Sequence, residues 1–466
     1  MESNRIENYS RRYKSYNNRN LDQISEKKDI PEKLAEEIKI ASMVIPFRTN
    51  EYIIDELIEW DQIPSDPIFI LNFPQKSMLN DEHYNKLQKA ILDDYPQERI
   101  NEIKNDIYRE LNPHPGGQIC YNTPKFKGKD LKGIQHKYRE TVLCFPSEGQ
   151  MCHAFCTYCF RWAQFIGKRE LKLALENPQD LVDYVQANSE VQEILFTGGD
   201  PMIMKVNKLE KYINPLLESK IKHLKTIRIG TKSLTYWPNR YVSDTDSEEI
   251  LDLFKKIVDA NIHLAVVSNF NHPNELKTDI AKKAIKNIQS TGAVIRTQSP
   301  ILNNINADHE IWIELIRREV DLGMIPYYMF MPRDTGAKDY FDISLIDAFR
   351  IYTKSIRKLS GLCRTIRGPV MSTTPGKIQV IGITSILDKR VIALKFIQGR
   401  NPKWVGRIFF AKFNREASWL DGLEPALTKK FFYEHELIKY LHPYGFQEAE
   451  VIEEEISGMK EITEET

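Results

Sequence analysis

The sequence predicts an α/β protein built around a partial TIM-type barrel, and two observations favour this fold class. From about residue 141 onward, short runs rich in β-branched residues alternate with amphipathic helical patterns, which is typical of parallel strands joined by helices. Residues 31–111 instead show only the three-or-four-residue spacing of helices. We therefore expect a (β/α)6 barrel preceded by a helical N-terminal domain and followed by a small C-terminal extension.

The chain divides by composition into segments with different expected structures. Residues 1–30 are charged and Asn-rich without a period, which predicts a flexible arm. A helical domain (31–111), a linker rich in Pro, Gly and Lys (112–135), the barrel (136–372) and the extension (373–466) follow. The helical domain is predicted from EKLAEEIKIASMVI, NEYIIDELIEW, YNKLQKAILDDY and RINEIKNDIYREL.

The expected barrel strands are short and evenly distributed. They are 141–145, 192–197, 226–231, 263–269, 293–298 and 325–330. In such barrels the chemistry lies at the C-terminal ends of the strands. In the extension, IQVIGIT and RVIALKF predict two paired strands, 427–441 predicts a helix, and the acidic residues 448–466 are expected to fray.

Composition indicates an enzyme that acts on small molecules. The chain has 466 residues, 41% hydrophobic content, and 65 basic against 65 acidic residues, so net charge gives no reason to expect a nucleic-acid partner. The N-terminal residues form no apolar signal segment, and no apolar run approaches the roughly 18 residues of a membrane span. We expect a cytoplasmic location and no membrane association.

Three cysteines stand within eight residues, in the segment MCHAFCTYCFRW, directly after the first expected strand. Cys152, Cys156 and Cys159 offer three thiolates from one loop, which suits a 4Fe-4S cluster with one iron left open. A structural zinc site needs four ligands. The other cysteines, at positions 120, 144 and 363, are isolated in the sequence, which argues against such a site. A disulfide would be an awkward crosslink among three such close neighbours.

The Cys-x3-Cys-x2-Cys spacing resembles that of the radical S-adenosylmethionine (SAM) enzymes. That resemblance implies a free iron that chelates SAM, and a cluster electron that cleaves SAM to a 5'-deoxyadenosyl radical. Gly198, Gly199 and Asp200 follow the second expected strand in FTGGDPM. Glycines permit close backbone approach and the acid can accept hydrogen bonds from an ammonium group. The resemblance identifies this segment with the family motif that holds the SAM amino group.

From Gly133 to Lys377 the chain resembles more narrowly the lysine 2,3-aminomutase family. The shared sequence segments are GIQHKYRETVL, CHAFCTYCFRW, FTGGDP, IRIGTKS, FNHPNEL, TQSPIL, IPYYMF and a late Pro-Gly-Lys. The resemblance places the lysine that holds pyridoxal phosphate (PLP) at Lys377, the arginine that grips the substrate carboxylate at Arg161, and a SAM-contacting glutamine at Gln298. It also places the PLP phosphate near Lys137, Tyr138 and Arg139.

Lys377 needs a particular environment for that role. A lysine in a Pro-Gly turn is by default a solvated surface residue. A lysine that forms an imine must be buried and partly desolvated, so that its amine is neutral. The sequence alone does not show which of these applies to Lys377.

Several positions depart from the family pattern. Two family aspartates surround the substrate's terminal ammonium, but here the first position holds Arg333, with Asp334 beside it, and the second falls in residues 371–374, which contain no acid. An arginine would repel an ammonium and pair with a carboxylate. This favours glutamate or another polar amino acid as substrate; a register shifted by one residue would restore a lysine-like contact through Asp334.

Other departures concern cofactors. Thr141 replaces an expected arginine, a single Gly376 precedes Lys377, and the C-terminal cysteine trio that binds zinc in some members is absent, so no zinc is predicted.

The sequence thus predicts an isomerase, an amino-acid 2,3-aminomutase that uses a 4Fe-4S cluster, SAM and PLP, with a reductase, flavodoxin or ferredoxin as electron donor. A PLP-independent radical SAM enzyme acting on a peptide or RNA, and a non-enzymatic iron-sulfur protein, are the alternatives. Substrate, product stereochemistry and oligomeric state, a homo-oligomer among the options, stay open.

Overall fold

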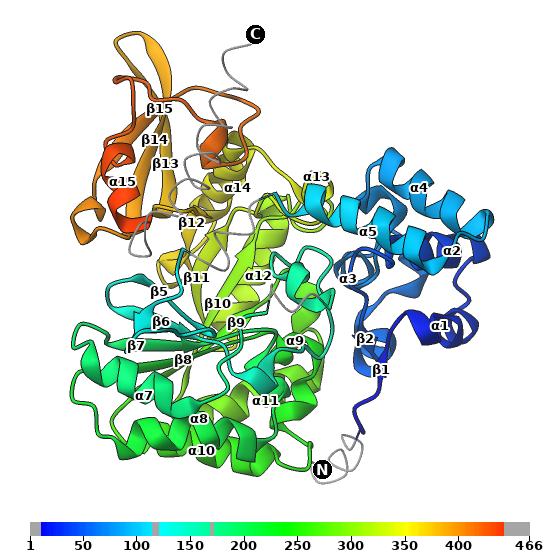
Figure 1. Ribbon diagram of the computed structural model, residues 1–466, viewed down its shortest axis with the longest axis horizontal. Helices are drawn as coiled ribbons and strands as arrows, with labels where there is room; N and C mark the ends of the chain where they lie inside the picture. Colours follow the sequence, from blue (N-terminus) through cyan, green and yellow to red (C-terminus); the bar gives the residue numbers. More distant parts are fainter. Residues whose placement is uncertain (1–10, 114–120, 168–171, 442–466) are drawn as a thin grey trace.

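The core of the molecule is one eleven-stranded sheet whose strands follow one another in chain order, from β5 at one edge to β15 at the other. The structure is a computed structural model that describes residues 11–113, 121–167 and 172–441. Figure 1 shows the sheet with helices packed along it, the N-terminal helices to one side and the C-terminal strands at the far end. The predicted mixed α/β class is confirmed, and the described strands form an open sheet rather than a closed barrel.

The parallel part of the sheet agrees closely with the predicted strands. Its members are β6 (Thr141–Cys144), β7 (Glu193–Phe196), β8 (Thr226–Thr231), β9 (His263–Asn269), β10 (Val294–Pro300) and β11 (Ile325–Phe330). A further strand, β12 (Arg367–Ser372), also pairs in parallel with β11. It was not predicted because Gly368 and Pro369 interrupt its apolar pattern.

Helices cover one face of this sheet. They are α7 (Pro178–Ala187), α8 (Val206–Glu218), α10 (Ser247–Asp259), α11 (Asp279–Ser290), α12 (His309–Asp321) and α14 (Leu345–Arg357). In β8 the buried Ile227 and Ile229 belong to the core shared with these helices, while Arg228 and Gly230 alternate with them. Since neighbouring side chains on a strand point to opposite faces, the polar positions line the other face.

The N-terminal part of the described chain is mainly helical. It contains α1 (Leu21–Lys28), α2 (Glu32–Ala41), a π-helical turn (Ile53–Leu57), α3 (Pro67–Asn72), α4 (Asp81–Leu92) and α5 (Gln97–Leu111). The expected flexible arm is ordered from residue 11 onward: β1 (Ser15–Tyr16) pairs with β2 (Thr49–Asn50), and α1 buries Leu21 and Ile24. These partners lie far along the chain, so local composition did not reveal them.

The linker and the extension each contain strands that the sequence did not predict. A short ribbon, β3 (Lys125–Phe126) and β4 (Lys129–Asp130), precedes β5 (Ile134–Tyr138), which pairs antiparallel with β6. In the extension, β13 (Gly376–Ile386) and β14 (Lys389–Gly399) pair as predicted, and β15 (Ile408–Lys412) follows.

The last described helix is shorter than predicted. It spans only α15 (Glu434–Leu441), because Phe431 and Tyr433 pack instead against the aromatic core around Phe396 and Phe409. Residues 448–466 lie outside the described residues. Within the described ranges, no helix combines the length and apolarity needed to cross a bilayer.

Candidate active site

The cysteine loop is held by backbone hydrogen bonds to the N-terminal domain. The amides of Phe155 and Thr157 donate to the carbonyls of Arg48 (2.8 Å) and Leu71 (3.0 Å), and the Thr157 hydroxyl donates to the carbonyl of Ile70 (2.7 Å). The hydroxyl of Tyr13 donates to the carbonyl of His153 (2.7 Å). These hydrogen bonds fix the cysteine loop against the N-terminal helices.

The three cysteine thiols lie close enough to influence one another electrostatically. Burial raises the pKa of Cys152 well above its ordinary value, and Asp200, Cys159 and Cys156 raise it further. Burial, with Cys156, raises the pKa of Cys159 to about 12. The five described cysteines are free thiols, and Cys120 lies outside the described residues.

The donor set suits a cluster better than a single ion. Among the described residues, no three His, Cys or acidic side chains are grouped as a single metal ion would need. A 4Fe-4S cluster asks for less convergence because each cysteine binds a different iron. Its positive iron atoms would also stabilise the thiolates that burial alone disfavours. Cys152, Cys156 and Cys159 therefore fit a cluster with three protein ligands.

The Gly-Gly turn after β7 lies directly against the segment that leads into this loop. A Cβ on Gly199 would lie 2.6 Å from the Met151 carbonyl oxygen, and one on Gly198, whose φ is +149°, would lie 2.7 Å from Nε2 of Gln150. The structural demand for glycine here is thus close contact between β7 and the cysteine loop.

Asp200 is buried and its carboxylate is already satisfied by the protein. Its oxygens accept hydrogen bonds from the Thr231 hydroxyl (2.7 and 2.8 Å) and from the amides of Lys232 and Met202 (both 2.9 Å). Burial raises the pKa of Asp200 to about 6. The carboxylate links the ends of β7 and β8, and these bonds leave it less available to a ligand ammonium than the sequence suggested.

A buried polar network joins the next strand ends to the cysteine loop. Nζ of Lys232, after β8, donates to Oδ1 of Asn271 (2.8 Å) and to Oε1 of Glu275 (2.7 Å). The Tyr158 hydroxyl, between the second and third cysteines, donates to Oδ1 of Asn269 (2.9 Å) and of Asn271 (2.8 Å).

Gln298 lies between this network and the surroundings of Lys377. On β10 it pairs with Asn269 of β9 on one side and with Tyr328 of β11 on the other. This position is next to both the loop network and the surroundings of Lys377.

Lys377 is half-buried at the start of β13. Its Nζ donates to Oε1 of Gln398 (2.7 Å) and lies 4.8 Å from the ring centre of Tyr328 and 5.5 Å from that of Tyr138. Burial, together with the positive charge of Arg228, lowers the pKa of Lys377 to about 7. A large fraction of this amine is therefore neutral near pH 7, as imine formation requires.

Further cations gather beside Lys377. Nζ of Lys137 donates to the Thr373 carbonyl, and burial followed by Arg400, Arg333 and Lys377 lowers its pKa well below the ordinary value. This concentration of positive charge suits a phosphate group. The Tyr138 hydroxyl lies buried beside Ser372, and the positive charges of Arg333 and Arg400 reach it.

Arg139 does not join this cationic group. It is exposed and forms an ion pair with Glu190, away from Lys377. Arg139 lies in the turn that follows β5, whereas Tyr138 is the buried last residue of that strand.

Arg161 and Arg333 approach the same aromatic ring. The guanidinium carbons of Arg161 and Arg333 lie 5.1 and 4.7 Å from the ring centre of Phe160, and that of Arg161 lies 4.4 Å from Phe145. Burial and the charge of Arg333 lower the pKa of Arg161 to about 10.

The two arginines have little compensating negative charge. Arg333 donates to the Ser372 hydroxyl (3.3 Å), and Asp334 is the acid that counters its burial. Neither guanidinium forms an ion pair with a carboxylate among the described salt bridges. Two such groups in one site suit a ligand with two negative ends.

The loop that carries Arg333 is anchored to the N-terminal domain. Nε1 of Trp162 donates to the Thr335 hydroxyl (2.9 Å), and that hydroxyl in turn donates to the Leu111 carbonyl (3.0 Å). This chain of contacts sets the position of Arg333 relative to the residues that follow Cys159.

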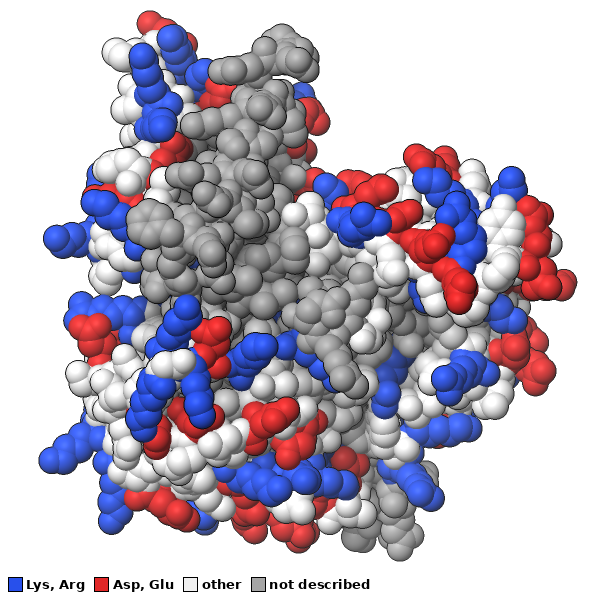
Figure 2. All heavy atoms as spheres, in the orientation of Figure 1, with Lys and Arg blue, Asp and Glu red and all other residues white. Residues whose placement is uncertain are grey.

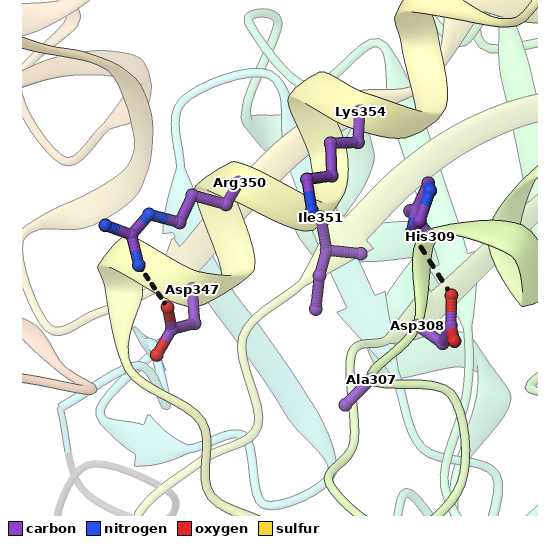
Figure 3. A pocket seen from close by; sticks show the side chains of 7 residues that line it. All are labelled: Ala307, Asp308, His309, Asp347, Arg350, Ile351 and Lys354. Atoms are coloured by element: carbon purple, nitrogen blue, oxygen red, sulfur yellow. Dashed lines mark hydrogen bonds and ion pairs between the residues drawn. The ribbon is translucent and has the colours of Figure 1, made fainter.

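A separate pocket of about 350 Å³ lies on the helices of the outer face, between the start of α12 and α14. Figure 3 shows its charged side chains in neighbouring pairs, with Asp347 bonded to Arg350 (2.9 Å) and Asp308 to His309 (3.2 Å). Two of its acidic side chains are thus paired within the pocket, and none of the predicted site residues lines it.

Several residues of this site were not among those predicted from the sequence. Tyr236, Lys232, Phe160, Gln398 and Arg400 all contact predicted site residues. Lys232 lies in the shared segment IRIGTKS, and this segment could have identified it as a site residue. Gln398, near the end of β14, and Arg400, directly after that strand, lie in no shared segment.

Comparisons with known proteins identify the family to which the chain is similar. A protein of Aquifex aeolicus named "Putative L-lysine 2,3-aminomutase" is 30% identical over 393 residues, covering 84% of this chain and 91% of that protein. The L-lysine 2,3-aminomutase of Haemophilus influenzae is 30% identical over 235 residues, covering 49% of this chain and 63% of that protein. The glutamate 2,3-aminomutase of Clostridioides difficile is 28% identical over 200 residues, covering 43% of this chain and 44% of that protein.

Two further comparisons add little. No family model matches the chain. The solved structure of native anSMEcpe with bound AdoMet aligns with 47% of this chain and 59% of its own, at a TM-score of 0.34 and 13% identity, which is too low to support an argument. The match to the Aquifex protein, nearly complete in both chains, shows that this chain belongs to the lysine 2,3-aminomutase family of radical SAM enzymes.

Proposed function

We propose that the protein is a PLP-dependent amino-acid 2,3-aminomutase whose preferred substrate carries an acidic side chain, with glutamate as the first candidate. In this proposal the parallel strands form a partial barrel that holds SAM and PLP at the strand ends. The observation that carries the proposal is Lys377, an amine with a pKa of about 7 surrounded by cations and aromatic rings.

Each part of the site has a distinct task. When bound, the cluster with SAM supplies a hydrogen-abstracting radical, and PLP supplies the π-system across which the amino nitrogen moves from Cα to Cβ. Lys377 holds PLP, and Lys137 with Arg400 faces its phosphate. Arg161 binds the α-carboxylate through its planar guanidinium and so orients the β-hydrogen. Gln298 and the Gly198–Gly199 turn contact SAM.

The charge of the site supports an acidic substrate. Arg333 is buried near Arg161, and the facing segment around Ser372 supplies a hydroxyl and no acid. A substrate ammonium placed here would meet a like charge, which costs several kcal/mol when desolvated. A second carboxylate would instead find a buried donor.

The proposal is tested on anaerobically reconstituted enzyme supplied with SAM, PLP, a low-potential reductant and glutamate. We expect NMR to detect the β-amino isomer of glutamate. Borohydride reduction followed by mass mapping should place a pyridoxyl group on Lys377. Lys377→Ala should lose both signals and keep the cluster, whereas Lys395→Ala, a half-buried lysine on β14, should lose neither. SAM cleavage without a pyridoxyl adduct would reject the amino shift.

The alternative enzyme would modify a peptide or RNA without PLP. Figure 2 shows Lys and Arg interspersed with Asp and Glu on the visible face, a distribution unlike the single-sign surface that binds a polyanion. Retention of a peptide- or RNA-dependent product by Lys377→Ala would favour this alternative. An iron-sulfur protein without enzymatic activity would not cleave SAM at all.

A further inference from the structure

The hydroxyl of Tyr236 approaches one of the cluster cysteines. Tyr236 is 1% exposed, and its oxygen lies 3.3 Å from Sγ of Cys156. That sulfur is its hydrogen-bond partner in the structure. A cysteine that binds iron has lost its proton, so in the loaded protein the sulfur accepts and the phenol donates.

The surroundings of Tyr236 strengthen this donor. Nζ of Lys232 lies 4.7 Å from the centre of the tyrosine ring, and a cation over the ring face withdraws electron density from the phenol. The same ammonium is fixed by Asn271 and by Glu275, whose side chain is fully buried. Lys232 therefore cannot move away without breaking a buried ion pair.

Tyr158, between Cys156 and Cys159, also lies within hydrogen-bonding reach of Cys156. Its hydroxyl proton, however, is directed to the side-chain oxygens of Asn269 and Asn271, which leaves Tyr236 as the phenol that donates to the sulfur. The backbone of the Tyr236 segment is also fixed, because Nδ2 of Asn50 donates to the Tyr236 carbonyl (2.9 Å). The backbone and the hydroxyl of Tyr236 are thus both held by hydrogen bonds, which keeps the phenol directed toward Cys156.

We propose that Tyr236, supported by Lys232, is a positioning residue that sets the reduction potential of the cluster through a hydrogen bond to Cys156. One electron enters the cluster from an external low-potential reductant, and Tyr236 keeps its proton. The added electron increases negative charge on the cysteine sulfurs, so a donor to sulfur stabilises the reduced form more than the oxidised form. The bond therefore raises the potential.

The consequence for catalysis is a compromise. A higher potential eases reduction by the electron donor but leaves less driving force for SAM cleavage. The inference rests on the cluster of this family and does not depend on the amino-shift proposal. It is therefore measured without amino acid, PLP or SAM.

The test is a potentiometric titration of the reconstituted protein with dithionite, followed by the EPR signal of the reduced cluster. Tyr236→Phe should shift the midpoint potential to a more negative value. Replacement of Tyr236 by 3-fluorotyrosine, a stronger donor of the same shape, should shift it to a more positive value. Tyr241→Phe removes another buried hydroxyl of the same region, one bonded to Ser233 at 2.7 Å, and should leave the potential unchanged.

Unchanged potentials in both Tyr236 variants would overturn the inference. An equal shift in Tyr241→Phe would also overturn it, because the effect would then follow from general disturbance of the region. If Tyr236→Phe fails to retain the cluster, the fluorotyrosine protein still decides, since it preserves the packing of the side chain.

Discussion

The two ends of the site differ in how far their polar groups are satisfied by the protein itself. At the cysteine loop, amides and hydroxyls meet carbonyls of the N-terminal domain, and Lys232 meets Glu275. At the other end, around Lys377, the side chains of Lys137, Arg161, Arg333 and Lys377 lie near one another with little acid to offset them. Buried like charges are costly. The polar groups of the first end therefore satisfy one another, whereas those of the second suit anionic ligands.

The contrast predicts that reversing one charge at the end around Lys377 changes specificity most. Arg333→Asp should lower kcat/KM for glutamate by about 10³-fold, since a donor becomes a repelling acid worth several kcal/mol. Activity on lysine should rise relative to glutamate. Asp334→Asn, one residue away, is the matched control and should preserve the preference for glutamate. If Asp334→Asn alone altered the lysine activity, the neighbouring register would be correct.

Removing Arg161 should weaken every amino-acid substrate alike. Arg161→Gln loses a charge-assisted bidentate contact worth about 1.5–3 kcal/mol, which corresponds to a fall of about 10- to 150-fold in kcat/KM. The fall should be the same for glutamate and lysine, because both carry an α-carboxylate. Arg139→Gln, at the exposed partner of Glu190, should have no effect. A substrate-selective loss would assign Arg161 to the side chain instead.

The lowered pKa of Lys377 predicts that the reaction of this lysine with PLP depends on pH near neutrality. Because its pKa is lowered to about 7, PLP capture should speed up as pH rises through 7 and level off above it. An ordinary lysine would need a pH above roughly 10. Arg228→Gln removes a charge that lowers this pKa and frees Glu193, its partner at 2.7 Å, so the midpoint should move upward. The rate of borohydride-trapped adduct formation measures it.

A control for that experiment lies on a neighbouring strand. Arg296 stacks on Tyr327, as Arg228 does, but is not among the charges that act on Lys377. Arg296→Gln should therefore leave the midpoint in place. Equal shifts in the two variants would indicate a general effect of removing positive charge from the sheet, rather than a specific effect of Arg228.

The smallest effect is expected at the satisfied end. Thr157→Val deletes the buried hydroxyl that donates to Ile70, which should cost about 1 kcal/mol and lower Tm by a few degrees. Substrate preference should stay unchanged. Thr384→Val, at an exposed position of β13, should leave Tm unaltered. A change in specificity in Thr157→Val would contradict the division of the site into two ends.

The sequence predicted the elements that repeat locally and missed those that depend on distant partners. Strands such as β8 and β9 match because β-branched runs between helical patterns carry their own signal. The strand β5 lacks it, since Gln135, His136 and Lys137 make it look like a linker, and its pairing with β6 is a tertiary fact.

The same distinction holds within the site. Motif resemblance named Lys377, Arg161 and Arg333, which the structure brings together. It could not show that Arg139 forms an ion pair with Glu190. Nor could it show that the Asp200 carboxylate accepts hydrogen bonds from Thr231 and two backbone amides. These outcomes depend on an ion pair and on hydrogen bonds between residues far apart in the sequence, which no single segment records.

The hydrogen bonds between the cysteine loop and residues 48–71 bear on the order of assembly. Because carbonyls of Arg48, Ile70 and Leu71 shape the loop, the helical domain must fold onto the sheet before the loop reaches the form described here. The cysteine loop and the helical segment are therefore one structural unit, and a substitution that displaces residues 48–71 would reach the cysteines through the backbone.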